Sequence, residues 1–257
     1  MPNLDPRLRL DVLGAGPAYT DRPGAVGAAY LVRHGSTALV LDLGQGAFTR
    51  LAGTIEPSTL DAILVSHLHP DHFVDLVAMR HYLRWEFRPH RHLRVIGPAG
   101  LEQRLDALHG EPGFCAAVLD IEPLTAGSLV VGDALVEAAR IHHTEDSYAF
   151  RVSRPGGGTG LVYSGDCGRA EDLDALIQPG DTLLSEVSFG PGPADPDAAH
   201  LDGPAVGRLA ARTSAGQVLL THLLMGHDDD ATIDSVRVHF DGPVTLVAPG
   251  DEYGIGG

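Results

Sequence analysis

The sequence lacks the features of a secreted or membrane-bound protein. Its only two cysteines, Cys115 and Cys167, lie far apart in the sequence and do not form a disulfide framework. No run of about 20 apolar residues that could cross a membrane occurs in it, and residues 1–7 contain no apolar stretch typical of a signal peptide. Low-complexity tracts, and repeats with a period of about 20 to 50 residues, are also missing. We therefore expect a soluble, cytoplasmic protein with no membrane partner.

Basic residues are also scarce. The chain has 18 Lys and Arg residues against 34 Asp and Glu, which gives a formal net charge of −16 at pH 7. Because such a charge repels a polyanion at long range, extended nucleic acid is not expected as a partner. One segment, residues 80–94, is an exception, and it is either a phosphate-facing patch or the solvated face of a helix and its exit loop. Its basic residues are Arg80, Arg84, Arg88, Arg91 and Arg94.

Apolar residues make up 44% of the 257 residues, which is enough to bury a sizeable core. The sequence is interrupted only by short turns rich in glycine and proline, at residues 154–158 and 190–193. Neither turn is long enough to link two domains. We expect a single domain over residues 1–257.

Apolar runs predict strands in both halves of the chain. In the first half the predicted strands are 9–13, 29–32, 37–41, 63–65 and 93–96, with helices at 72–87 and 100–108. In the second half, two strands around a turn within 128–141 precede strands at 149–152, 161–163, 182–184, 217–220 and 244–247, with a helix at 202–215. Two similar halves predict an α+β fold with two sheets packed face to face and helices outside. Arg151 is expected on a strand surface.

The most informative segment is Ser66–His72, which contains three histidines and one aspartate within seven residues. It follows directly after the apolar run 62–65, so the cluster lies at the end of a buried strand. Imidazole and carboxylate groups are the ligands that suit zinc, manganese and iron. This segment predicts a metal site. Its candidate ligands are His67, His69, Asp71 and His72.

Further candidate ligands follow other predicted strands. The pair His142-His143 follows the strand that ends at Ile141, Asp166 follows strand 161–163, and His222 follows strand 217–220. A strand end is a place where polar side chains can gather without being buried unpaired. The residues alone do not decide between His142 and His143.

Taken in order, Asp42, the segment Ser66–His72, His143, Asp166 and His222 resemble the metallo-β-lactamase superfamily of metal hydrolases. The resemblance covers nearly the whole chain and implies a four-layer αββα sandwich with the site at one edge, between the sheets. It further implies two divalent ions, with zinc favoured and manganese or iron as alternatives. By this analogy His67, His69 and His143 hold one ion; Asp71, His72 and His222 hold the other, and Asp166 bridges them.

Several further segments are similar to the ribonuclease Z-like branch, which includes small cyclic-nucleotide phosphodiesterases: 143–151, 164–166, 185–189, 200–201 and 220–222. The branch's serine lies four positions after its third ligand, and Ser147 therefore selects His143 over His142. The Thr-Pro-Gly-His run of lactonases and glyoxalases is missing. Members that process tRNA carry a long arm after the third ligand, whereas here only the stretch 148–164 separates that motif from Asp166. A tRNA-processing role is therefore not expected.

The resemblance implies a phosphodiesterase that cleaves a small or short, cyclic-nucleotide-like diester through a metal-bridging hydroxide. His200 is the expected proton donor to the leaving group, and Asp71 is counted with the catalytic residues as well as the ligands. Asp42 is expected to hold a ligand imidazole or to order the loop under the metals. Glu186 could hold His200 or a ligand, or be structural at its strand end. Alternatives are a ribonuclease Z-like nuclease, a lactone or carboxylic-ester hydrolase, and a metal scaffold without turnover. The predicted helix 72–87 could supply a homodimer face.

Overall fold

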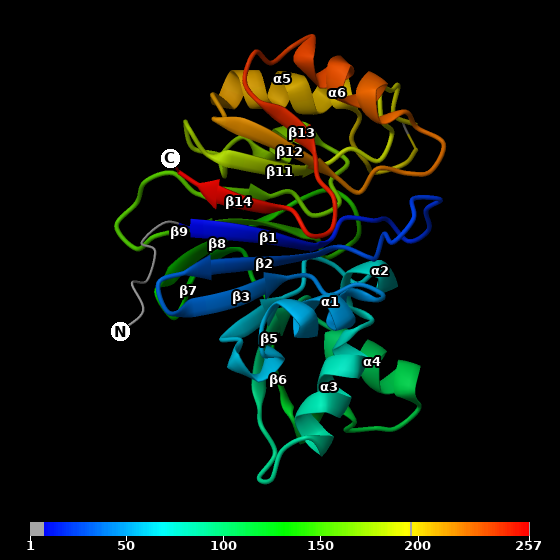
Figure 1. Cartoon of the computed structure of the whole chain (residues 1–257), viewed down its shortest axis with the longest axis vertical. Helices are drawn as coiled ribbons and strands as arrows, with labels where there is room; N and C mark the ends of the chain where they lie inside the picture. Colours follow the sequence, from blue (N-terminus) through cyan, green and yellow to red (C-terminus); the bar gives the residue numbers. More distant parts are fainter. Residues whose placement is uncertain (1–7, 196, 257) are drawn as a thin grey trace.

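The computed structural model describes residues 8–195 and 197–256 (Figure 1). These residues form two mixed sheets of seven strands each. The first sheet has the order β14-β1-β2-β3-β4-β5-β6. Its strands are β1 (Leu8–Gly14), β2 (Ala29–His34), β3 (Thr37–Leu41), β4 (Ala62–Leu64), β5 (Leu93–Gly97), β6 (Leu119–Pro123) and β14 (Glu252–Ile255). Strands β3 to β6 run parallel to one another, whereas β14, β1, β2 and β3 pair antiparallel.

The second sheet has the order β13-β12-β11-β10-β9-β8-β7. Its strands are β7 (Gly127–Val131), β8 (Ala134–Arg140), β9 (Tyr148–Ser153), β10 (Leu161–Tyr163), β11 (Thr182–Glu186), β12 (Gln217–Thr221) and β13 (Val244–Leu246). Strands β10 to β13 are parallel, and β7 to β10 are antiparallel. The two parallel regions matter for function, because parallel strands deliver the residues that follow them to one edge of the sheet.

Helices cover the outer face of each sheet. The helices of the first half are α1 (Ala47–Thr54), α2 (Pro70–Phe73), α3 (Leu76–Trp85) and α4 (Leu101–His109), and those of the second are α5 (Gly203–Thr213) and α6 (Asp229–Arg237). In Figure 1, α1, α3 and α4 lie in the lower half of the molecule and α5 and α6 at the upper end. Among the described residues, none of the helices combines the length and apolarity needed to cross a membrane.

Alternation along the strands explains the layering. In β2, Tyr30 and Val32 belong to the apolar cluster between the two sheets, whereas Ala29 and Leu31 belong to the cluster under the first-half helices. Successive strand residues point to opposite faces, so a continuous apolar strand can serve two cores at once. A third cluster, which includes Val206 of α5, lies between the second sheet and its helices. Three apolar layers between four layers of structure give the αββα sandwich.

The expectation for Arg151 is wrong. Its side chain points from β9 toward the outer layer and is buried, with 1% exposed. It donates two hydrogen bonds to Asp181 and one to Glu137, as well as one to the carbonyl oxygen of Gly158. A buried guanidinium is tolerated here because its charge and its donors are matched by these groups.

Candidate metal centre

The seven predicted ligands come from loops that follow strand ends. His67, His69, Asp71 and His72 follow β4, and His143 follows β8, while Asp166 and His222 come after β10 and β12. Each of these strands ends at the same edge of the sandwich, and there the side chains converge into two groups of potential ligand atoms. One group is His67, His69, His143 and Asp166, and the other is Asp71, His72 and His222; a further set of potential ligand atoms combines Asp166 and His222 with His200. The atoms within each group lie within 4.8 Å of one another.

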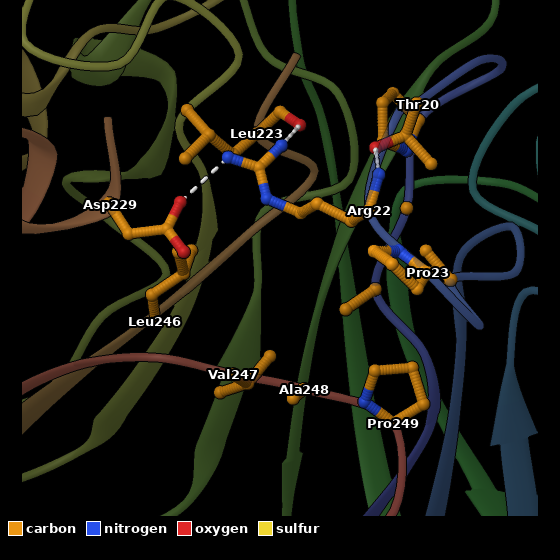
Figure 2. A pocket seen from close by; sticks show the side chains of 13 residues that line it. Thr20, Arg22, Pro23, Leu223, Asp229, Leu246, Val247, Ala248 and Pro249 are labelled. Carbon is orange, nitrogen blue, oxygen red and sulfur yellow. Dashed lines mark hydrogen bonds and ion pairs between the residues drawn. The ribbon is translucent and has the colours of Figure 1, made fainter. Parts of the chain in front are cut away.

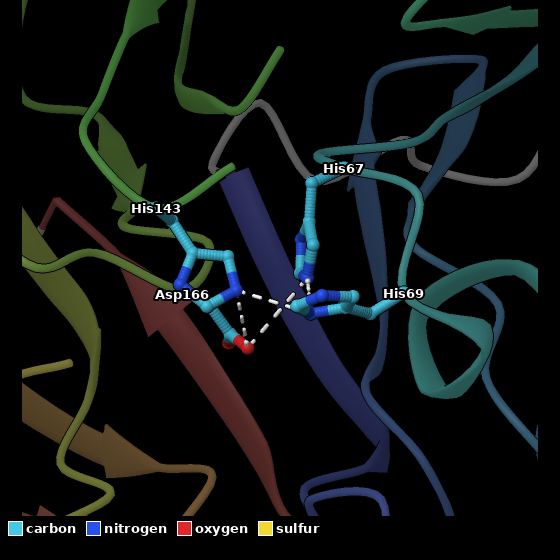
Figure 3. A group of neighbouring side chains, drawn as sticks. All are labelled: His67, His69, His143 and Asp166. Atoms are coloured by element: carbon cyan, nitrogen blue, oxygen red, sulfur yellow. Dashed lines mark hydrogen bonds and ion pairs between the residues drawn. The ribbon is translucent and has the colours of Figure 1, made fainter. Parts of the chain in front are cut away.

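In the first group, three imidazole nitrogens face one another (Figure 3). The Nδ1 atom of His69 is 3.1 Å from Nε2 of His67 and also 3.1 Å from Nε2 of His143. The Oδ2 atom of Asp166 lies 3.7 Å from each of these two Nε2 atoms. His69 is exposed whereas His67 is buried, so this side of the centre opens to solvent.

In the second group, Nε2 of His222 lies 3.3 Å from Nε2 of His72 and 3.3 Å from Oδ2 of Asp71. Asp166 also reaches this group, because its Oδ2 is 3.4 Å from His72 and its Oδ1 is 3.5 Å from His222. A single carboxylate therefore contacts both groups. The remaining distance, from Oδ2 of Asp71 to Nε2 of His72, is 3.6 Å.

These distances fit metal ligands better than hydrogen-bonded side chains. Donor atoms about 2.0–2.1 Å from a tetrahedral ion are separated by about 3.3–3.4 Å, close to the spacings in both groups. The Oδ1 atom of Asp166 is buried and has no hydrogen-bond partner among the described residues. A buried carboxylate oxygen without a donor is costly, and a cation would satisfy it. The donor set of imidazoles and carboxylates thus suits zinc, manganese or iron.

Four of the imidazoles are held from behind by a hydrogen bond to their other nitrogen. Nδ1 of His67 lies 3.1 Å from Oγ of Ser66, and Nδ1 of His143 lies 2.8 Å from the carbonyl oxygen of Ala199. Nδ1 of His72 is 2.7 Å from a carboxylate oxygen of Asp42, and Nδ1 of His222 is 3.1 Å from Oγ of Ser188. Such outer contacts fix the tautomer and the orientation of a ligand ring, as is typical of metal-binding histidines.

Asp42 is the most connected of these supporting residues. It is fully buried, and its carboxylate accepts hydrogen bonds from the backbone N–H and the hydroxyl of Ser66, from His72 and from the hydroxyl of Tyr163. Its φ of 59° is in the left-handed region, which a non-glycine residue rarely adopts. The structure therefore gives Asp42 the supporting position expected for it. No sequence pattern points to a role for Tyr163, because a tyrosine in a buried strand is equally typical of core packing.

The candidate histidine ligands differ in the direction in which burial and nearby charges shift their pKa. Burial lowers the pKa of His67, His69 and His143, which favours the neutral imidazole that a metal requires. For His72, burial acts in the same direction, but the carboxylates of Asp166 and Asp42 outweigh it and raise the pKa. The same negative field that would hold a proton on His72 would hold a divalent cation.

His200 lies beside both groups. Its ring centroid is 4.7 Å from that of His143 and 5.9 Å from that of His222. Nδ1 of His200 is 2.9 Å from Oε1 of Glu186, which leaves Nε2 without a partner among the described residues. Burial opposes the charged form of His200, but the Glu186 carboxylate outweighs it and raises the pKa.

Glu186 accepts hydrogen bonds from several groups besides His200. It is buried at the end of β11, and its carboxylate accepts hydrogen bonds from the backbone N–H groups of Cys167, Ser188 and Leu201. The hydroxyl of Ser188 also donates to it. Both roles considered for Glu186, holding His200 and fixing strand ends, are therefore present in one residue.

Other histidines and cysteines lie away from the ligand groups. His142 is exposed, and its backbone N–H donates to Asp172. Cys167 directs its thiol to the carbonyl oxygen of Arg169, and burial raises its pKa. The thiol is thus held away from the donor atoms of its neighbour Asp166.

The arginines of segment 80–94 do not form one patch. Arg80 is buried, donates to the carbonyl oxygen of Phe114 and lies 4.0 Å from that ring's centroid. Arg94 pairs with Glu122, and Arg84 lies over Trp85. Segment 80–94 is thus partly structural and partly an exposed turn, and Trp85 is 57% exposed.

Comparisons with known proteins agree with this geometry. Residues 40–223 match the family described as the β-lactamase superfamily domain. The chain belongs to the metallo-β-lactamase superfamily. An uncharacterised protein of Mycobacterium leprae is 33% identical over 260 residues, which cover 96% of this chain and 89% of that protein. Ribonuclease Z of Mycobacterium bovis is 28% identical over 199 residues, or 70% of each chain.

Among solved structures, the metallo-β-lactamase-fold protein YhfI from Bacillus subtilis superposes with a TM-score of 0.86. The sequences are 22% identical, and the match covers 97% of this chain and 100% of that chain. The four-layer αββα sandwich predicted from the sequence is confirmed, and so is membership in a family of metal-dependent hydrolases.

Proposed function

We propose that the chain is a phosphodiesterase that uses two divalent ions, with zinc favoured, to hydrolyse a small or short phosphodiester. The observation that carries the proposal is the position of Asp166, whose carboxylate contacts both groups of ligand atoms. Two ligand groups close enough to share a carboxylate fit a two-metal site, an arrangement that phosphatases and nucleases use. The first ion would be held by His67, His69 and His143, and the second by Asp71, His72 and His222, with Asp166 serving both.

Two bound ions would lower the pKa of a bound water and would place positive charge near the phosphoryl oxygens. The chain itself supplies rigid ligands and a proton. Ser66, Asp42, Ala199 and Ser188 hold the ligand imidazoles in place. Asp71 is proposed as a catalytic residue as well as a ligand, because its carboxylate lies in the second group beside His72 and His222.

His200 is proposed as the acid that protonates the leaving alkoxide. Glu186 holds its Nδ1 and favours the protonated ring, so Nε2–H is available to donate toward the centre. The side chain of His200 is 21% exposed, which leaves room for a substrate to approach it.

The proposal of a small substrate rests on what surrounds the centre. Strands β9 and β10 pair directly and are joined by residues 154–160 alone, so a tRNA-gripping arm has no place between them. The net charge of −16 adds long-range repulsion toward RNA. A cytoplasmic location is also proposed. A homodimer formed through the α3 face is proposed as well, since exposed Trp85 ends that helix.

A turnover panel tests the function. The metal-loaded protein is assayed on bis-p-nitrophenyl phosphate, cyclic nucleotides, an acyl-homoserine lactone and a tRNA precursor, with Asp166→Ala as the control for contaminating enzymes. We expect hydrolysis of the small diesters and weak or no cleavage of the RNA at physiological salt. Efficient RNA processing with inert small diesters would instead identify a ribonuclease Z-like nuclease. Turnover of the lactone alone would identify a carboxylic-ester hydrolase.

A further inference from the structure

A cavity of about 170 Å³ lies at the edge of the sandwich where β1, β12 and β13 end (Figure 2). We name it the loop pocket. It is enclosed by the loop that follows β1, residues 15–27, together with the segments 223–229 and 246–249. Its wall-forming apolar residues include Pro17, Pro23, Leu223, Leu246 and Pro249.

The loop pocket adjoins the second group of ligands. Loop 15–27 begins against His222, whose backbone N–H donates to the carbonyl oxygen of Ala15. The loop ends against Asp71, because a Cβ atom at Gly27 would lie only 2.7 Å from the carbonyl oxygen of that residue. Leu223, which lines the pocket, follows His222 directly in the sequence. The pocket is therefore built by the same backbone that positions two of the ligands.

The size and walls of the pocket suit one aromatic ring system. A dry cavity of about 150 Å³ lined by apolar side chains holds a benzene molecule. Here three prolines and several aliphatic side chains line a slightly larger space. Because the prolines are rigid, such a pocket can bind a flat ring with little loss of conformational entropy.

The polar residues of the pocket do not favour a phosphate group. Arg22 donates to the carbonyl oxygens of Leu223, Leu224 and His227 and forms an ion pair with Asp229 at 2.7 Å. Its guanidinium thus fastens loop 15–27 to the segment after His222, and its charge is matched. The remaining polar groups of the lining include the second oxygen of Asp229 and the hydroxyl of Thr20, and both can accept from the N–H groups of a heterocycle.

We propose that the loop pocket binds the aromatic base of a nucleotide diester whose phosphate lies at the metal centre. This assignment rests on the proposed phosphodiesterase function and specifies its substrate class. A neutral, flat ring with N–H donors fits the apolar walls, the matched charges and the acceptors on the rim. Ala15 and Leu223, which line the pocket, contact or adjoin His222, so the base would lie on the side of the centre formed by the second ligand group.

Two substrates with the same leaving group isolate the contribution of the base. Thymidine 5′-(p-nitrophenyl phosphate) carries a base, and methyl p-nitrophenyl phosphate does not, while both release p-nitrophenolate. We expect kcat/KM to be at least tenfold higher for the thymidine ester, roughly the gain from half-burying an aromatic ring. Equal values for the two substrates would overturn the proposal and leave the phosphodiesterase function intact.

A pair of matched variants locates that contribution. Ala248→Leu places a larger side chain in the loop pocket, whereas Ala126→Leu does the same in a second cavity of about 170 Å³ between Arg94 and Leu129. The ratio of kcat/KM for the two esters should fall close to one in Ala248→Leu and stay at the wild-type value in Ala126→Leu. A wild-type ratio in both variants would place the base elsewhere.

Binding of adenosine, measured by saturation-transfer NMR, keeps the pocket testable if neither ester is hydrolysed. Adenosine has no phosphate, so its binding does not depend on the metal chemistry. We expect saturation transfer to the adenine protons with the wild type and Ala126→Leu, and its loss with Ala248→Leu. Binding with this pattern but without turnover would retain the pocket and reject the phosphodiesterase. If the wild type gives no saturation transfer and hydrolyses neither ester, both proposals fail.

Discussion

The hydroxyl of Tyr163 donates a 2.7 Å hydrogen bond to Oδ2 of Asp42, the same oxygen that lies 2.7 Å from Nδ1 of His72. Tyr163 belongs to the second sheet and Asp42 follows a strand of the first, so this contact crosses the interface between the sheets. It fixes the carboxylate that orients a candidate ligand. Burial raises the pKa of Tyr163, which keeps the hydroxyl protonated and donating.

Replacing Tyr163 by phenylalanine should therefore weaken metal binding without touching a ligand. We expect Tyr163→Phe to lower zinc affinity by roughly tenfold, the lower end of the range for residues that support a ligand. Tyr30→Phe is the matched control, because its hydroxyl is equally buried but bonds to Thr221 instead of Asp42. Competition with a chromophoric chelator measures the zinc affinity of both variants. Equal losses in the two variants would show that the effect is on packing and not on Asp42.

The metal content of the purified protein tests the two-ion centre. We expect about two divalent ions per chain, since seven ligands serve two ions that each need about four to six. Asp166→Ala should lower occupancy at both positions, because its carboxylate contacts both groups. Mass spectrometry of the metals, with circular dichroism to verify folding, gives the count. One ion at saturation in the folded wild type would contradict the prediction.

The two adjacent histidines offer a paired test. His143→Ala should mainly lower occupancy of one ion, because its Nε2 lies in the first ligand group. His142→Ala should leave the metal content unchanged, since that side chain is exposed and outside both groups. The same metal analysis distinguishes them, and loss in His142→Ala with none in His143→Ala would reverse the assignment.

Loss of the proposed acid should depend on the leaving group. We expect His200→Ala to lower kcat by roughly 10²–10⁴-fold for a diester with an alkoxide leaving group, the usual range for general acid catalysis. The loss should be much smaller with p-nitrophenolate, which needs little protonation. Metal content should stay the same. Equal losses on both substrates would mean that His200 does not act as the acid.

The dependence of activity on pH should be set in part by Glu186. Because Glu186 raises the pKa of His200, the protonated acid persists above the ordinary histidine range, and activity falls only as pH rises through that raised value. Glu186→Gln removes the carboxylate charge and lowers this pKa, so the alkaline decline should shift to lower pH. Rates of an alkoxide diester, measured from about pH 5 to 10, show the shift. If the alkaline decline of activity lies at the same pH in Glu186→Gln and in the wild type, Glu186 does not control the titration.

Much of the fold was predictable because apolar periodicity marked its strands. The hairpin of β2 and β3 and the strands that precede the ligands were found from runs such as 62–65 and 217–220. Two α-helices, α1 and α6, and two strands, β6 and β14, were missed. β14 and β6 are edge strands with one buried residue each, and such strands carry little apolar signal. The helix predicted over 72–87 is divided into α2 and α3 near Asp75, whose carboxylate binds the backbone of Phe48.

The candidate site likewise contains residues that the sequence predicts and residues that it does not. Its ligands stood out because polar residues directly after apolar strands are conspicuous, and family resemblance chose among them. The supporting residues Ser66, Ser188 and Tyr163 carry no such signal, since their role depends on which neighbour each one reaches in space. The burial of Arg151 escaped prediction for the same reason, because Asp181 lies 30 positions away.

The candidate ligands come from both halves of the chain: residues 67–72 lie between β4 and β5 of the first sheet, whereas His143, Asp166 and His222 belong to the second half. Each bound ion would therefore tie together segments that are remote in sequence, in a chain whose two cysteines are both free. Ligand binding to the folded state alone stabilises it by mass action. The free energy of unfolding thus depends on the concentration of free metal. Removal of the metal by a chelator should loosen the packing between the two sheets before either sheet unfolds.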